Sequence, residues 1–149
     1  MRNAFSLVEL MIVAAVIGIL AALSVPYLHN HAAEAKQAAT RENLRVLREA
    51  IKFYAVHHND TGPGYPGNNR SAQPTEDSFR LQVIIEQNYL RKVPANPFNG
   101  METIHIIGNA EGFPAEATGD YGWIYQPATG TIRCDWPGSD NDGVRYVDY

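Results

Sequence analysis

The chain has 149 residues and a formal net charge of −4. This length suits one small domain with an extended element rather than two full domains. The acidic balance argues against a nucleic-acid partner, because such a partner requires a basic patch or stripe.

The first predicted element is an apolar helix over residues 5–28, in which Glu9 is the only charged residue. At about 1.5 Å per residue, these positions form a helix about 36 Å long, enough to cross a hydrocarbon core of about 30 Å. A secretory signal peptide that is cut near residues 22–24 is the alternative. It fits less well, because the apolar stretch is long and contains a carboxylate. We therefore expect a transmembrane segment.

Glu9 is the informative residue of this segment. An ionised side chain within a membrane helix costs about 2–3 kcal/mol or more, and it usually has a functional partner. A free α-amino group of an adjacent chain would be such a partner, whereas a carboxylate that reaches the lipid headgroups is the alternative. The carboxylate therefore indicates a role in assembly.

The stretch Ala4-Phe5-Ser6-Leu7-Val8-Glu9-Leu10-Met11-Ile12-Val13 resembles the class III signal of type IV pilins and type II secretion pseudopilins. In that family a membrane peptidase cuts before a phenylalanine and N-methylates it, and a glutamate is the fifth mature residue. The resemblance implies a leader over residues 1–4, cleavage between Ala4 and Phe5, methylation of Phe5, and pairing of Glu9 with the Phe5 amine of a neighbouring subunit. Pro26 falls where many members carry a helix-loosening proline. The chain differs from the family's pattern at Ala4, a position at which the family usually has glycine.

A second helical stretch is predicted over residues 29–58, which continues the first into one helix of about 50 residues. Its apolar residues recur at helical spacing: Leu44, Leu47, Ile51 and Tyr54. Thr75 is a predicted N-cap that opens a short helix ending near Tyr89. Beyond it, Pro94 and Pro97 fix an extended turn.

The remaining elements are predicted strands over residues 103–107, 121–126 and 131–135, and the last two form a hairpin. Cys134 is the only cysteine, so no disulfide can form within the chain. We expect it to be a small buried hydrophobe in its strand, with an intermolecular bridge or a reactive thiol as the alternative. The fold class is α+β: a long N-terminal helix packs its second half against a small antiparallel β-sheet head with one short extra helix. Residues 29–149 form this extracytoplasmic head.

The C-terminal loop around residues 138–143 is rich in oxygen ligands. Asp135, Asp140 and Asp142 offer the carboxylates that Ca²⁺ prefers, and the resemblance to major pseudopilins implies a calcium site in this region. A solvated turn is the alternative. No nucleophile, phosphate-loop or metal-ligand motif of an enzyme is present in the sequence, so we expect no catalytic activity.

The sequence predicts a subunit of a type II secretion pseudopilus, similar to the G-type major subunit. Its predicted partners are further copies in a helical filament, the prepilin peptidase, other pseudopilins and the inner-membrane secretion platform. We expect a bacterial inner-membrane location, with a cytoplasmic N-terminus and a periplasmic head. A major or minor type IV pilin is one alternative, and a membrane-anchored binding module is another. The missing cysteine pair favours the pseudopilin, because many type IV pilins close a C-terminal loop with a disulfide.

Overall fold

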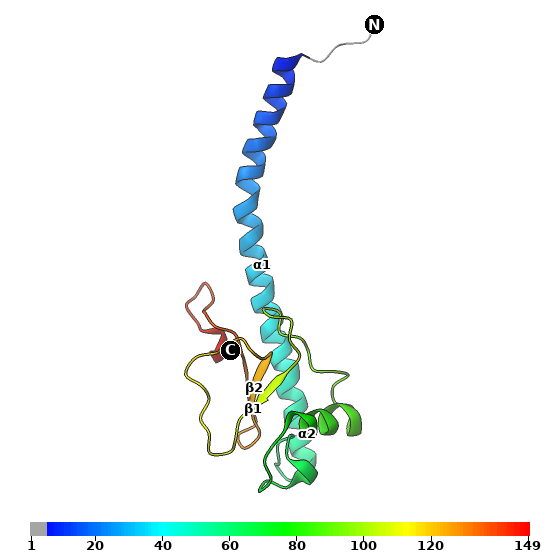
Figure 1. The fold of residues 1–149 in the computed structure, drawn as a ribbon. Helices are drawn as coiled ribbons and strands as arrows, with labels where there is room; N and C mark the ends of the chain where they lie inside the picture. Colours follow the sequence, from blue (N-terminus) through cyan, green and yellow to red (C-terminus); the bar gives the residue numbers. More distant parts are fainter. Residues whose placement is uncertain (1–5) are drawn as a thin grey trace. The chain divides into compact units, whose positions relative to one another are not determined.

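The structure is a computed structural model that describes residues 6–149, apart from the side chains of residues 21–30. The chain divides into two compact units, residues 1–36 and residues 37–149. From here on, the head means the second of these units, residues 37–149. The long helix α1 runs from Leu7 to His57 and contributes to both units (Figure 1).

The head contains short elements after α1. Its helices are a 3₁₀ helix Pro66–Asn68, α2 Glu76–Arg80, a π-helix Leu81–Glu86 and a 3₁₀ helix Tyr146–Asp148. Its strands are β1 Ile104–Ile106, β2 Trp123–Gln126 and β3 Thr131–Cys134. The predicted cap of the short helix is confirmed, because Thr75 Oγ1 accepts a hydrogen bond of 3.2 Å from the Ser78 amide.

The sheet is mixed, so the predicted all-antiparallel sheet is wrong. β2 and β3 form the predicted antiparallel hairpin, in which Trp123 is paired with Cys134, but β1 runs parallel to β2 with Ile104 opposite Trp123. A parallel pair needs a long crossover, and residues 107–122 provide one between these strands. The α+β class is nevertheless confirmed, with a long helix, a small sheet and a short extra helix.

The core of the head lies between the C-terminal part of α1 and the sheet (Figure 1). The predicted apolar stripe of α1 is entirely buried, with Leu44 and Leu47 fully covered. Its partners include the largest buried side chains of the sheet, Trp123 and Tyr125. Burial of this stripe explains why its apolar residues recur at helical spacing.

Asn96 is a buried polar residue in the turn that leads to β1. Its Nδ2 donates hydrogen bonds to the Gly122 carbonyl oxygen at 2.9 Å and to Cys134 Sγ at 3.4 Å, and its Oδ1 accepts one from the Phe98 amide at 3.0 Å. Cys134 is fully buried, as predicted. Burial raises the pKa of its thiol to about 12, against the opposing hydrogen bond from Asn96.

Candidate assembly segment and C-terminal loop

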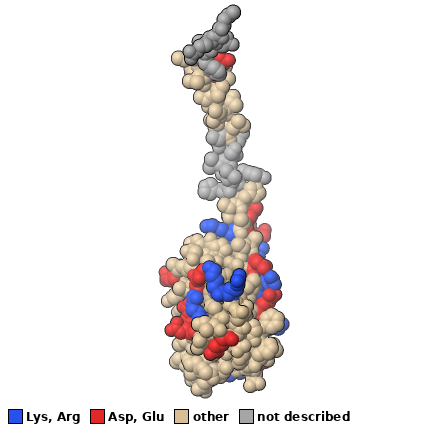
Figure 2. Space-filling view, turned by 90° about the vertical axis from the view of Figure 1, so that its right-hand side faces the viewer, with Lys and Arg blue, Asp and Glu red and all other residues tan. Residues whose placement is uncertain are grey.

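The described part of the N-terminal unit exposes apolar side chains on all sides. Every side chain from Ser6 to Leu20 is exposed, and the large hydrophobic ones are 47–75% exposed. In Figure 2 this segment is almost free of charged side chains, whereas acidic and basic groups alternate over the head. A contiguous apolar surface of this kind marks a site that another surface covers.

Several predicted site residues fall outside the part that the structure describes. Ala4 and Phe5 lie there, and so does the side chain of Pro26. Among the described residues, no helix combines the length and apolar character that a membrane span needs. Cleavage, methylation, helix loosening and the transmembrane segment over residues 5–28 stay predictions.

Glu9 lies in the first turn of α1, where it forms a capping box with Ser6. Ser6 Oγ accepts a hydrogen bond from the Val8 amide at 3.3 Å, and Glu9 Oε2 accepts one from the Ser6 amide at 3.4 Å. This pairing satisfies amide groups that a helix start leaves unpaired, and the helix dipole favours a carboxylate there. The Ser-x-x-Glu spacing is visible in the sequence, although Glu9 was interpreted there only as a charge within a membrane helix. The capping contact uses one carboxylate oxygen and leaves the other open to solvent or to a partner.

The C-terminal loop is tied to α1 through Asp140, whose side chain is only 1% exposed. Asp140 Oδ2 accepts hydrogen bonds from Arg41 Nη2 at 2.9 Å and from the Tyr149 hydroxyl at 2.7 Å. Its Oδ1 accepts from the amides of Asp142 and Val144, at 3.0 and 2.9 Å. These contacts lower the pKa of Asp140, with the Tyr149 hydroxyl as the largest cause.

Arg41 also stacks on the ring of Tyr149, with its guanidinium carbon 4.3 Å from the ring centre. Burial and the neighbouring Asp140 raise the pKa of the Tyr149 hydroxyl to about 12. Arg41 on α1 therefore supplies a positive charge beside Asp140, the buried carboxylate of the loop.

The three predicted calcium ligands are not brought together. Asp135 lies elsewhere in the head, where its carboxylate accepts hydrogen bonds from the Thr118 amide and hydroxyl at 2.8 and 3.1 Å and from the Tyr121 amide at 3.0 Å. Within the described part of the chain, no group of three or more His, Cys, Asp or Glu side chains could hold a metal ion. At Asp140 both carboxylate oxygens already accept hydrogen bonds, Oδ2 from Arg41 and Tyr149 and Oδ1 from two backbone amides. Calcium binding stays a prediction without a gathered ligand set.

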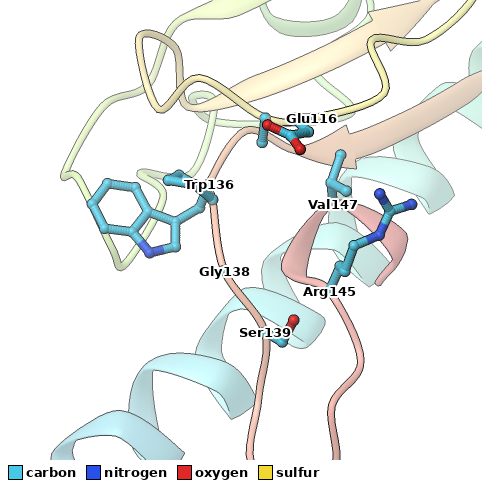
Figure 3. A pocket seen from close by; sticks show the side chains of 8 residues that line it. Glu116, Trp136, Gly138, Ser139, Arg145 and Val147 are labelled. Atoms are coloured by element: carbon cyan, nitrogen blue, oxygen red, sulfur yellow. The ribbon is translucent and has the colours of Figure 1, made fainter.

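A shallow hollow of about 250 Å³ lies beside the C-terminal loop (Figure 3). Trp136 and Arg145 flank it, and Glu116 lies above it in the view. Arg145 Nε is 2.8 Å from an oxygen of Asp148, and Arg145 Nη1 donates to the Ala115 carbonyl at 2.9 Å. Because the guanidinium is already engaged within the chain, the hollow does not present it to a ligand.

A second apolar stripe of α1 begins at the edge of the core, where Ala50 is buried and Val46 is partly buried, and it was not predicted from the sequence. Val46, Ala50, Phe53 and Val56 recur at spacings of four, three and three residues. Phe53 is 56% exposed and Val56 is 66% exposed. We call the surface around them the Phe53 groove; its lining is Val46, Glu49, Ala50, Lys52, Phe53, Val56, His57, Asn88, Tyr89 and Leu90.

Comparison with known proteins finds sequence relatives of the chain. The model of the prokaryotic N-terminal methylation motif matches residues 1–25. The chain is 35% identical over 109 residues to a fimbrial protein of Neisseria meningitidis, which covers 73% of this chain and 58% of that protein. It is 26% identical over 103 residues to the type II secretion system core protein G of Escherichia coli K12, which covers 65% of this chain and 67% of that protein. The chain is therefore similar to type IV pilin-like proteins, both in its N-terminal methylation motif and over 65–73% of its length.

Further relatives of the chain have the same two kinds of name. The core protein G of Aeromonas hydrophila is 28% identical over 102 residues, or 65% of this chain and 68% of that protein. The matched part of this chain spans little more than half the length of the Neisseria protein. No solved structure matches the chain. The names of these relatives are those of a fimbrial protein and of core proteins of type II secretion systems.

Proposed function

We propose that this pilin-like protein is a subunit of a type II secretion pseudopilus, polymerised through its N-terminal helix. The exposed apolar segment between Ser6 and Leu20 is the observation that carries the proposal, because only a lipid environment or neighbouring helices can cover such a surface. Before assembly the segment over residues 5–28 holds the subunit in the inner membrane, with the head in the periplasm. Assembly exchanges lipid contacts for contacts with other copies.

Processing precedes assembly in this proposal. The prepilin peptidase cuts between Ala4 and Phe5 and methylates the new amino terminus, in line with the methylation motif that matches residues 1–25. The Phe5 amine of one subunit then pairs with Glu9 of the next. In a low-dielectric environment either charge is costly alone, so the pair sets the axial register of the filament. Pro26 lets the helix adjust where it leaves the membrane.

The secretion role is supported by relatives named core protein G from three bacteria, including Pseudomonas aeruginosa, and by the single cysteine, which cannot close a loop by an intrachain disulfide. A type IV pilus role is the second candidate, because the Neisseria relative with 35% identity is named a fimbrial protein. Deletion of the gene in its native host separates the two roles. Loss of protein secretion with surface pili unchanged supports the pseudopilus, whereas loss of pili with secretion unchanged supports the pilus.

The assembly role of Glu9 is tested by Glu9→Gln and Glu9→Ala in the full chain. Glutamine keeps an oxygen that can accept the Ser6 amide, so Glu9→Gln preserves the cap but removes the charge, and Glu9→Ala removes both. We expect both variants to lose filament yield in a sheared-filament assay, while the processed protein still accumulates in the membrane. Filaments at the wild-type level from either variant would show that the carboxylate does not pair with the Phe5 amine.

A further inference from the structure

Two dipeptides of the head can undergo a reaction that changes the course of the main chain. Asp142-Gly143 and Asn99-Gly100 are the only Asp-Gly and Asn-Gly pairs in the sequence. In such a pair the glycine nitrogen can attack the side-chain carbonyl carbon Cγ of the preceding residue, because glycine has no side chain that hinders the approach. A Cβ placed on Gly143 or Gly100 would have no heavy atom within 4 Å, so both pairs are sterically open. The way in which each side chain is held therefore decides which pair reacts.

The Asn99 side chain is fixed by three hydrogen bonds. Its partners are the Gly119 carbonyl at 3.1 Å, the Tyr121 carbonyl at 2.8 Å and the Met101 amide at 3.0 Å. The Gly100 amide is also engaged, because it donates to the Asn96 carbonyl oxygen at 2.7 Å. The carboxamide can reach the Gly100 nitrogen only after these hydrogen bonds are broken, so the fold protects Asn99 from the reaction.

The Asp142 side chain is held far less firmly. It is exposed, and within the part of the chain that the structure describes its carboxylate takes part in no hydrogen bond or ion pair. The Gly143 amide donates one hydrogen bond, to the Asp140 carbonyl oxygen at 3.1 Å. Ring closure at Asp142 therefore breaks one hydrogen bond of the folded head, whereas ring closure at Asn99 breaks those of both its side chain and the Gly100 amide.

We infer that Asp142 is a site of spontaneous isomerisation to isoaspartate, and that the product loosens the C-terminal loop from α1. The Gly143 nitrogen forms a bond to Asp142 Cγ, and the carboxyl hydroxyl leaves as water with the proton of that nitrogen. The product is a five-membered succinimide ring. Water then adds to the ring and opens it at the former main-chain carbonyl, so the chain continues through the Asp142 side chain. The inference does not depend on the proposed filament.

The isomerised loop no longer fits around Asp140. Isoaspartate adds one methylene to the main chain between Asp142 and Gly143. Val144 lies directly beyond this point, and its amide donates to Asp140 Oδ1 at 2.9 Å while its carbonyl accepts from the Asp140 amide at 2.9 Å. The added atom displaces both groups. The carboxylate that pairs with Arg41 then loses part of its support, so the attachment of the loop to α1 weakens with the age of the protein.

Ageing of the purified full chain in detergent tests the site. Folded protein and protein in urea are kept for several weeks near neutral pH. Peptide mapping with electron-transfer fragmentation then measures isoaspartate at Asp142 and deamidation at Asn99. We expect isoaspartate to accumulate at Asp142 in the folded chain. Deamidation of Asn99 should be at least about tenfold slower in the folded chain than in urea, because its hydrogen bonds must break first.

Asp142→Glu is the matched control. It keeps the negative charge on an exposed side chain, but its ring closure would need a six-membered ring, which forms much more slowly. We expect the melting temperature of wild type to fall on ageing, whereas that of Asp142→Glu should stay constant. The inference is overturned if aged wild type contains no isoaspartate at Asp142, if Asn99 deamidates as fast in the folded chain as in urea, or if aged Asp142→Glu loses as much thermal stability as aged wild type.

Discussion

Replacement of Asn96 by alanine is a direct test of how the head is held together without a disulfide. The Asn96 side chain is fully buried, and it links the turn before β1 to the start of β2 and to β3 through Gly122 and Cys134. Asn96→Ala leaves the Phe98 amide without its hydrogen-bond acceptor. It also removes one of the two donors to the Gly122 carbonyl, which still accepts a hydrogen bond of 3.2 Å from the Asp135 amide. The lost hydrogen bonds and the cavity together predict a cost of about 2–4 kcal/mol in the free energy of unfolding.

Asn99→Ala is the matched control in the same turn. Asn99 also makes three hydrogen bonds, to the Gly119 and Tyr121 carbonyls and from the Met101 amide, but it is less buried. Water can replace those bonds, so we expect a cost of only about 0.5–1.5 kcal/mol. Urea denaturation of the full chain in detergent, followed by tryptophan fluorescence, measures both values. An Asn96→Ala cost no larger than that of Asn99→Ala would refute the central role of the buried amide.

Two further predictions follow from ionisation in the head. Burial raises the pKa of the Cys134 thiol to about 12, so this thiol should not react with a thiol reagent at pH 8 in the folded chain. It should react fully in urea. Rapid modification of the native chain would contradict the burial of Cys134. The pKa of Asp140 is lowered from 3.8, so its charge stabilises the head above about pH 4, and this stabilisation is lost as the pH falls through the folded-state value. The melting temperature of Asp140→Asn should therefore lie below that of wild type at pH 7, and the difference between the two should shrink towards about pH 2. A difference that does not depend on pH would show that Asp140 does not stabilise the head through its negative charge.

Features that depend on neighbouring residues were predictable from the sequence. The Thr75 cap and the buried stripe of α1 follow from helix periodicity and local hydrogen bonds. The hairpin between β2 and β3 also follows, because its turn ends at Gly130, whose φ of 66° suits glycine.

Features that depend on distant residues were not predictable. The parallel pairing of β1 with β2 crosses a long loop that carries no strand signal of its own. The partner of Asp140 is 99 residues away in the chain, so the sequence alone did not indicate that Arg41 pairs with this carboxylate. The Phe53 groove was not predicted for another reason: its apolar residues on α1 adjoin the buried stripe, and only the packing shows that Phe53 and Val56 remain exposed.

The most direct test of the filament-subunit account is the chemistry of the mature amino terminus. Mass spectrometry of the protein extracted from membranes of its native host should find a chain that begins at Phe5 and carries one N-methyl group. The companion strain without the prepilin peptidase should retain Met1 and form no filaments. A mature chain that still begins at Met1 in the wild-type host would contradict the account, and it would favour a simple membrane-anchored binding module.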